Sequence, residues 1–191
     1  MTHESVTTGA VEIGQRVFLR PAWASDRAAF VALRRASRSE FERWEPEPAP
    51  GVDPFGDRSF DREISVVGDG GECRWLICRV GDGALVGRVT LGTIERGPFQ
   101  NGRLGYWIGT EFSGRGYMTE AIGLVLRRAF GVMGLHRVCA NIMPSNVGSR
   151  RVLERNGFVR EGYSEKYLQI AGVWADHERW AITAEMDRTA R

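Results

Sequence analysis

Apolar residues recur along the chain at two spacings: alternate positions, typical of strands, and every third or fourth position, typical of helices. The order of these runs predicts one strand, a helical region, three strands, a helix, a strand, a short helix and a final strand pair. Such a mixture indicates a single domain of α/β (α+β) class. The strand-like runs are residues 16–22, 73–80, 81–94, 101–109, 136–143, 158–170 and 173–183, and the helix-like runs are residues 26–37, 61–70, 117–130 and 145–155.

Polar residues and glycines mark where the helices begin and end. A helix starts well behind a side chain that accepts a hydrogen bond from its first turn. The expected caps are Ser25 or Asp26 for the first helix and Ser145 or Asn146 for the last, which ends before Gly157. We predict a flexible N-terminus over residues 1–15, a folded domain over 16–185 and a C-terminal tail over 186–191.

The segment 40–57 is the least regular part of the sequence, because its four prolines exclude a long helix or strand. It also carries Trp44 and Phe55. Two interpretations stay open: a solvated loop, or a functional loop that presents Trp44 to a ligand. Four acidic side chains in its first half would suit any cationic substrate: Glu40, Glu42, Glu45 and Glu47.

Composition narrows the class of protein without indicating a chemistry. The 191 residues carry a formal net charge of +2, which is too small to indicate nucleic-acid binding by itself. The three cysteines and three histidines show no CxxC motif and no zinc-ligand spacing, so no metal is expected. No signal peptide is predicted, and no apolar run approaches the roughly 20 residues that span a membrane. We expect a cytoplasmic protein with reduced cysteines.

The turn at residues 113–116, Ser-Gly-Arg-Gly, stands directly before a helix whose apolar stripe begins at Met118. A helix start leaves backbone N–H groups without partners and carries partial positive charge. Glycines let the backbone approach a ligand, and Arg115 adds a full charge, so one interpretation is a phosphate site. The other interpretation is a turn that only marks the start of the helix and binds no ligand, since neither GxGxxG nor GxxxxGK[ST] occurs in the chain.

A second motif, residues 140–158, runs from a strand into a polar helix start and ends on Asn-Gly-Phe. Together the two motifs resemble the GNAT superfamily of acetyl-CoA-dependent N-acetyltransferases. In that family the first loop follows Gln/Arg-x-x-Gly-x-Gly/Ala and binds the pyrophosphate of coenzyme A. Here residues 113–118 read Ser-Gly-Arg-Gly-Tyr-Met, so the first and last positions depart from the pattern. The resemblance implies a mixed, mostly antiparallel sheet flanked by helices, with splayed central strands, and acetyl-CoA as co-substrate.

Finer matches resemble one branch, the RimJ/RimL-type enzymes and most of all the RimJ type, over residues 16–183. They are "RWEPEPAP", "LGYWIG", "GRGYMTEA", "ANIMPSN" and "EGYSEKYLQIAGVWADH". The resemblance implies acetyl transfer to the α-amine of an N-terminal Ala or Ser, in a ribosomal protein. Two alternatives stay open: a GNAT enzyme of a small amine (an aminoglycoside, polyamine or amino acid), and a non-catalytic module that binds acetyl-CoA or the ribosome. A monomer or dimer is expected, with no membrane or nucleic-acid partner.

The resemblance also assigns binding roles. Backbone groups of Trp107 and Ile108 would hold the pantetheine arm, and Asn146 would hydrogen-bond that arm, cap its helix, or do both. Tyr106 and Trp107 point to opposite faces of their strand, so at most one of them belongs plainly to the core. The residues implied in cofactor binding are Trp107, Ile108, Ser113, Gly114, Arg115, Gly116, Tyr117, Met118, Thr119, Asn146 and Ser149. The residues implied in acceptor binding are Trp44, Tyr106, Asn141, Tyr167 and Trp174.

Catalytic groups are marked less clearly. The tyrosine that serves many relatives as general acid aligns with Leu153, so Ser149, one turn earlier, is expected to stabilise the leaving thiolate. The base is open because Asn141 stands where another N-terminal-alanine branch has a glutamate. The candidates are Glu165 (with Lys166 as the rival match), Asp176 and His177. Histidine exchanges protons near neutral pH, and a purely structural His177 is the equal alternative.

The missing glutamate bears on the kind of acceptor. An α-amine with a pKa near 7.8 needs about 1.1 kcal/mol to become neutral at pH 7, whereas a lysine amine with a pKa near 10.4 needs about 4.6 kcal/mol. An enzyme of α-amines can therefore work with a weak base.

Overall fold

The computed structural model describes residues 6–65 and 71–187. Eight strands in this part form one sheet: β1 Glu12–Ile13, β2 Val17–Arg20, β3 Cys73–Arg79, β4 Leu85–Glu95, β5 Asn101–Ile108, β6 Arg137–Ile142, β7 Val159–Ile170 and β8 Val173–Thr183. Their order is β1-β2-β3-β4-β5-β6-β8-β7. Neighbours run antiparallel, except that β5 and β6 are parallel.

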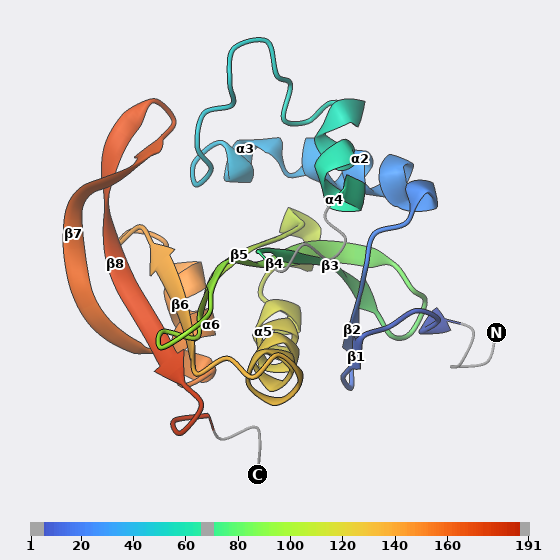
Figure 1. Cartoon of the computed structure of the whole chain (residues 1–191). Helices are drawn as coiled ribbons and strands as arrows, with labels where there is room; N and C mark the ends of the chain where they lie inside the picture. The colour runs from blue at the N-terminus through green and yellow to red at the C-terminus, as the bar shows by residue number, and fades with distance from the viewer. Residues whose placement is uncertain (1–5, 66–70, 188–191) are drawn as a thin grey trace.

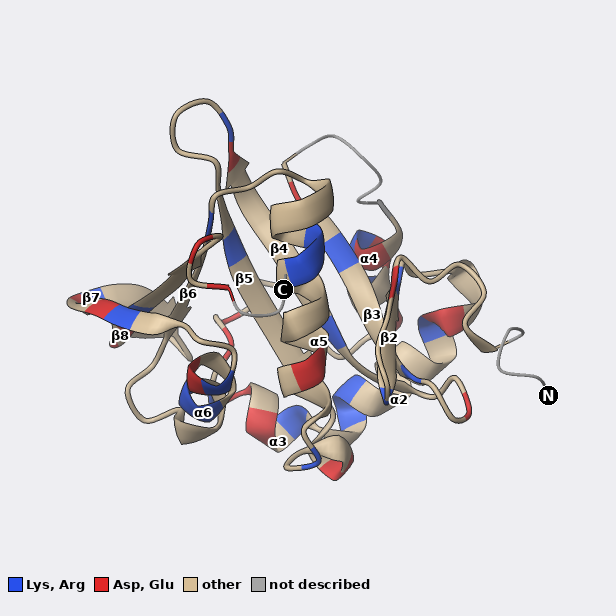
Figure 2. Cartoon of the chain, turned by 90° about the horizontal axis from the view of Figure 1, so that it is seen from below, with Lys and Arg blue, Asp and Glu red and all other residues tan. Residues whose placement is uncertain are grey.

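Helices cover both faces of this sheet (Figure 1). Helix α5 (Tyr117–Arg127) lies against one face, and α2 (Arg27–Ala36), α3 (Arg38–Phe41) and α4 (Asp61–Ser65) lie over the other, as the view from below also shows (Figure 2). Helix α6 (Val147–Arg155) follows β6 and contacts α5. The mixed, mostly antiparallel sheet with flanking helices confirms the predicted fold class. None of the described helices has the length and apolar character that a membrane crossing requires.

The core forms where the apolar patterns of the sequence meet. Six residues of the predicted stripe on α5 and its continuation are buried against the sheet, and Phe130 is partly buried. The chain leaves α5 through a π-helical turn at Arg128–Val132. The segment 42–56 is irregular, as its prolines predict, and residues 66–70 of the predicted helix lie outside the described residues. The six buried residues are Met118, Ala121, Ile122, Val125, Leu126 and Ala129.

The N-terminal segment is more ordered than the sequence predicts. Residues 1–15 are expected to be flexible, but β1 pairs with β2 inside this range. The Val11 N–H donates to the Leu19 carbonyl at 2.8 Å, and the Gly14 N–H donates to the Val17 carbonyl at 2.9 Å. A strand of two residues carries too little alternation to be recognised in a sequence. In the predicted tail, Asp187 is buried.

Asp26 stands at the start of α2, but its carboxylate does not cap that helix. It accepts two hydrogen bonds of 2.7 Å from the Arg20 guanidinium and one of 2.7 Å from the Trp23 N–H. Arg20 is buried, and a buried cation needs an ionic partner more than a helix start needs a cap. The predicted cap is therefore wrong about what Asp26 binds.

The pairing of β5 with β6 ends after three positions. Asn101, Gly102 and Arg103 pair with Arg137, Val138 and Cys139, and beyond them the two strands have no paired positions. The splayed central strands implied by the family resemblance are thus present. The edge of β5 that faces β6 leaves its backbone groups available from Leu104 onward.

Candidate active site

A cleft of about 520 Å³ opens where β5 and β6 part. Residues 104–108 of β5 and 140–143 at the end of β6 form its two walls. The turn before α5 and the first turns of α5 and α6 close one end, and the segment 40–45 with His177 of β8 lines the rest. The predicted site residues that line it are Trp44, Tyr106, Trp107, Ile108, Ser113, Gly114, Gly116, Tyr117, Met118, Thr119, Asn141, Asn146, Ser149 and His177.

The turn at residues 113–116 requires glycine for its backbone. Gly114 has φ +75° and Gly116, the N-cap of α5, has φ +78°, a region that other residues rarely adopt. A Cβ on Gly116 would lie 3.1 Å from both terminal nitrogens of Arg16, whereas a Cβ on Gly114 would meet nothing within 4 Å. Gly116 therefore also makes room for Arg16, which the sequence did not reveal.

Arg16 holds this turn from behind. Its Nη1 donates to the Arg115 carbonyl at 2.9 Å and its Nη2 to the Gly116 carbonyl at 3.4 Å. In a trans peptide the C=O and the following N–H point in opposite directions. The N–H groups of Gly116 and Tyr117 consequently point away from Arg16, free of the helix's own hydrogen bonds and available to an anion.

Glu120, in the first turn of α5, fixes Arg16 in this position. Its carboxylate accepts from the Arg16 backbone N–H at 2.9 Å and from Nε at 2.8 Å. Burial alone would raise the pKa of Glu120, but the hydrogen bonds from Arg16 outweigh it and hold that pKa below its usual value. The ionised carboxylate also suits the start of a helix.

Three arginines supply positive charge at the same end of the cleft. Arg115 is exposed on the turn, and its side chain does not line the cleft. Arg151 and Arg155 do line it, from one face of α6. This pair is not among the residues predicted from the sequence, although its i,i+4 spacing after a polar helix start is a usable signal. Guanidinium groups are well suited to phosphate oxygens.

Asn146 begins α6, and its Oδ1 accepts from the Ser149 N–H at 3.0 Å, which confirms the predicted cap. The cap uses only the carbonyl oxygen, so the side-chain NH₂ can still donate to a ligand. Leu153 is fully buried and does not line the cleft, whereas its neighbour Val152 does. The position of Leu153 therefore faces the core and would not present a hydroxyl to the cleft.

Trp107 and Tyr106 of β5 face opposite ways, as predicted. Trp107 packs its ring at 5.3 Å from Phe30 and 5.2 Å from Phe41, between centroids, and belongs to the core. Tyr106 is partly buried, and its side chain lines the cleft.

At the other end of the cleft the polar groups are largely engaged with one another. Trp44 Nε1 donates to Glu40 at 2.8 Å, and Glu45 forms a two-fold hydrogen bond with the buried Arg34, at 2.8 and 2.7 Å. Of these two cleft carboxylates, Glu45 is thus neutralised by an arginine. Asn141 Nδ2 donates to the Tyr167 hydroxyl at 3.0 Å, so Tyr167 supports the cleft from behind Asn141.

His177 is 3% exposed and lies beside Tyr167, with ring centroids 5.5 Å apart. Its Nδ1 is 3.0 Å from the Ala175 carbonyl. A carbonyl oxygen can only accept, so Nδ1 carries a proton and Nε2 of the neutral ring has a free lone pair. This is the tautomer that a base requires.

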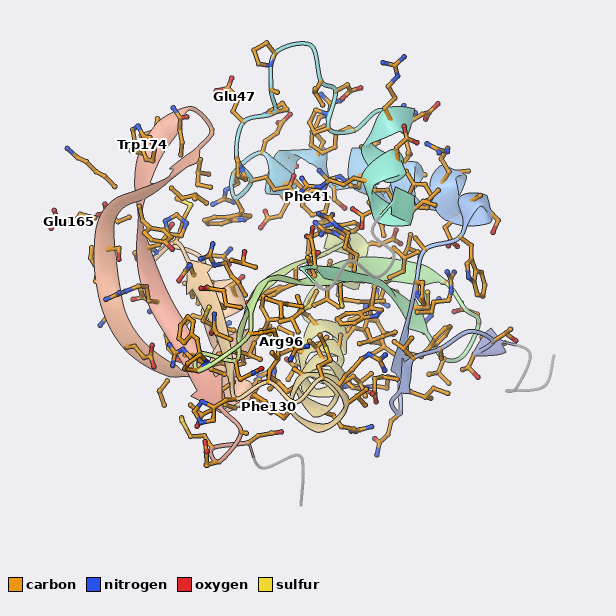
Figure 3. The ribbon with its side chains drawn as sticks, in the orientation of Figure 1. Phe41, Glu47, Arg96, Phe130, Glu165 and Trp174 are labelled. Atoms are coloured by element: carbon orange, nitrogen blue, oxygen red, sulfur yellow. The ribbon has the colours of Figure 1, made fainter. Side chains whose placement is uncertain are left out.

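The predicted residues Glu165 and Trp174, like Arg115 and Tyr167, do not line the cleft. Glu165 is exposed and points outward from β7 (Figure 3), so its carboxylate is not placed to act there. Ser164 pairs with His177, so the alternation of β7 turns the next residue, Glu165, to the opposite face. A bulge with Lys166 at φ +46° follows, and it breaks the alternation before Leu168. Trp174 is 59% exposed near the tip of the β7–β8 hairpin, across from the loop that carries Glu47 (Figure 3).

Asp176 is also unsuited to act as a base. The Tyr163 hydroxyl donates to it at 2.6 Å and the Lys166 N–H at 2.8 Å. These hydrogen bonds lower its pKa, and they occupy its oxygens away from the cleft. Of the predicted bases, His177 alone lines the cleft.

Comparison with known proteins accounts for this arrangement. The family model for the acetyltransferase (GNAT) domain matches residues 16–159. The chain belongs to the GNAT acetyltransferases. The probable N-acetyltransferase YjcK of Bacillus subtilis is 36% identical over 172 residues, which are 88% of this chain and 94% of that protein.

Two solved structures are also similar to this GNAT chain. Mycobacterium smegmatis RimJ in complex with CoA-disulfide has a TM-score of 0.80 and 34% identity, over 88% of this chain and 82% of that one. The ribosomal-protein-S5-alanine acetyltransferase from Vibrio fischeri has a TM-score of 0.79 and 26% identity, over 91% and 96%. The protein is thus an N-acetyltransferase with acetyl-CoA as co-substrate. The residues present fit this co-substrate, since unpaired helix N–H groups and arginines meet at one end of the cleft.

Removing Arg16 should loosen the turn at residues 113–116, which we call the phosphate turn. We expect Arg16→Ala to weaken coenzyme A binding about tenfold, roughly 1.4 kcal/mol, because the Arg115 and Gly116 carbonyls lose their support. Arg127→Ala is the matched control, since Arg127 lies on α5, is equally exposed at 53% and pairs with Glu12 instead. Calorimetric titration with coenzyme A decides: equal weakening in both variants would reduce the role of Arg16 to its charge.

Asn146 should have separable roles in stability and in binding. Ser is as good a helix cap as Asn, so Asn146→Ser should keep the unfolding free energy while coenzyme A affinity falls about tenfold. Asn146→Ala should lose affinity and also about 1 kcal/mol of stability. Thermal unfolding and titration measure the two quantities. Unchanged affinity in Asn146→Ser would leave Asn146 with the cap alone.

Proposed function

We propose that this enzyme transfers acetyl to the α-amine of protein N-termini that begin with Ala or Ser, a ribosomal protein being the expected acceptor. The observation that carries the proposal is the base available in the cleft: His177, whose Nδ1 lies 3.0 Å from the Ala175 carbonyl, is the only predicted base among the described residues that line it. Such a base suits an amine that is already partly neutral at pH 7, and α-amines meet this condition where lysines do not. The similarity to a RimJ and to an S5-alanine acetyltransferase supports the same acceptor.

The groups of the cleft divide the reaction between them. The turn before α5 and the arginines of α6 would hold the phosphates, and the free edge of β5 would hold the pantetheine arm. As the amine nitrogen attacks the thioester carbon, a C–N bond forms and the C–S bond breaks. His177 Nε2 takes the proton that the nitrogen loses, and the Ser149 hydroxyl donates a hydrogen bond to the departing sulfur.

Recognition of the acceptor would come from the opposite end of the cleft. Trp44 and Tyr106 supply aromatic walls, and Glu40 supplies a carboxylate that accepts from Trp44 and forms a wider ion pair with Arg43, at 3.7 Å. A terminal ammonium with a small first side chain fits this combination. Since the acceptor would be a newly made protein, we place the enzyme in the cytoplasm.

Substrate selectivity tests the proposal directly. A peptide beginning with Ala should be acetylated at its α-amine, much faster than the same peptide blocked at its N-terminus and carrying a lysine. The rate should rise between about pH 7 and 8.5, because the acceptor's own α-amine, with a pKa near 7.8, becomes neutral in that range. Mass spectrometry locates the acetyl group. Equal rates for both peptides, or reaction of spermidine but neither peptide, would contradict an N-terminal acceptor.

Loss of the base gives a second test. We expect His177→Gln to lower kcat for the Ala-peptide about 100-fold, at the lower end of what general-base catalysis contributes. His136→Gln is the matched control, because His136 is an exposed histidine that pairs with Glu185 far from the cleft. A rise in KM for the peptide with kcat unchanged would instead make His177 a binding residue.

A further inference from the structure

We propose that Tyr106 is a positioning residue for the leaving group, which holds the Ser149 hydroxyl so that the serine proton points at the sulfur of coenzyme A. Tyr106 is predicted from the sequence only as a wall for the acceptor. The inference rests on the role given to Ser149 in the proposed function, and it is independent of which amine is acetylated.

The unusual feature of Tyr106 is its hydroxyl. Tyr106 lies on β5 and Ser149 on the first turn of α6, and both side chains line the cleft between the parted strands. The Tyr106 Oη is buried, yet it has no partner of regular hydrogen-bond geometry among the described residues. Buried hydroxyls in proteins are nearly always paired, so this one calls for a specific reason.

The Ser149 hydroxyl is the group that acts on Tyr106. Burial raises the pKa of Tyr106 to about 12, and the Ser149 side chain opposes that rise. Both residues line the same cleft, Tyr106 from β5 and Ser149 from the first turn of α6. Ser149 is therefore the group with which we pair the buried, unpartnered hydroxyl of Tyr106.

The direction of that hydrogen bond follows from the chemistry of the two groups. Tyr106 keeps its proton at any pH at which an amine is acetylated, so it always has a proton to donate. If it donates to Ser149 Oγ, the serine proton must point elsewhere, and the cleft is the space in front of it. The hydrogen bond from the Ser149 hydroxyl to the sulfur also becomes stronger, because linked hydrogen bonds polarise one another.

The Tyr106–Ser149 pair would compensate for the general acid that α6 lacks at the position of Leu153. Leu153 faces the core, so α6 offers the departing sulfur only the hydroxyl of Ser149. A serine hydroxyl alone is a poor acid, but full transfer of its proton is not needed. When the C–S bond breaks, the electron pair stays on sulfur. The hydrogen bond stabilises this thiolate until it takes a proton from solvent, while the amine proton leaves through His177.

A double-mutant cycle tests the coupling. Tyr106→Phe keeps the ring and removes only the hydroxyl, so we expect kcat with acetyl-CoA and the Ala-peptide to fall about tenfold, while KM for both substrates stays within twofold. Ser149→Ala should lower kcat at least as far. In the double variant, Tyr106→Phe should have no further effect, because the hydroxyl through which it acts is absent.

Two results would overturn the inference. If the two factors multiply in the double variant, Tyr106 acts independently of Ser149. If Tyr106→Phe raises KM for the peptide and leaves kcat unchanged, the Tyr106 hydroxyl binds the acceptor and does not act on Ser149. Thermal unfolding of all four proteins excludes a general loss of folding as the cause of either result.

The same cycle is run without any acceptor, by following thiol release as water slowly attacks acetyl-CoA, since the same C–S bond breaks. If the losses in the rate of thiol release are coupled in the double variant and the Ala-peptide is not acetylated, the inference is supported and the proposed acceptor is wrong. If the losses are independent and the peptide is acetylated, the inference is wrong and the proposed acceptor is supported. If the wild-type enzyme released thiol in neither assay, the role of Ser149 and the inference would both be wrong.

Discussion

The active site depends on the early end of one strand pairing. β5 and β6 are parallel because α5 carries the chain across between them, and they pair at only three positions. Had the pairing continued, the backbone groups of residues 104–108 would bond to β6 and the cleft would close. Helices α5 and α6 follow the carboxyl ends of these two strands. Because the strand pairing ends early, the starts of both helices lie at the same opening. Ligands of α/β sheets bind at such points.

The phosphate turn is held in place by a residue outside its own sequence motif, residues 113–118. Arg16 precedes β2, and Glu120 lies in the first turn of α5, about a hundred residues along the chain. Their ion pair orients two carbonyl groups and thereby the N–H groups on the opposite side of the same peptides. The glycine at 116 is needed both for its positive φ and for the approach of Arg16. Gly116 is thus required both for the conformation of the turn and for the packing of Arg16 against it.

Periodicity predicts this fold well, because its long strands and helices carry repeated patterns, as the buried stripe of α5 illustrates. Features that depend on single residues are harder to predict from the sequence. The bulge between Ser164 and Leu168 breaks the alternation of β7, and β1 is too short to show alternation. Contacts between distant segments, such as Arg16 with residues 115 and 116, leave no local trace at all. The Asn146 cap could be predicted because both of its partners lie within one turn.

The small net charge of the chain hides a separation of charge along the cleft. Arg151 and Arg155 line the end near the turn at residues 113–116, while Glu40 and His177 line the other end. Such a field favours one orientation of an anionic cofactor and a cationic acceptor. A carboxylate used as the base would attract the ammonium and also stabilise its protonated form, raising the pKa that catalysis must overcome. In the proposed reaction, Glu40 on α3 would attract the amine and His177 on β8 would remove its proton. An imidazole base can accept that proton without holding the amine in its charged state, as a carboxylate base would.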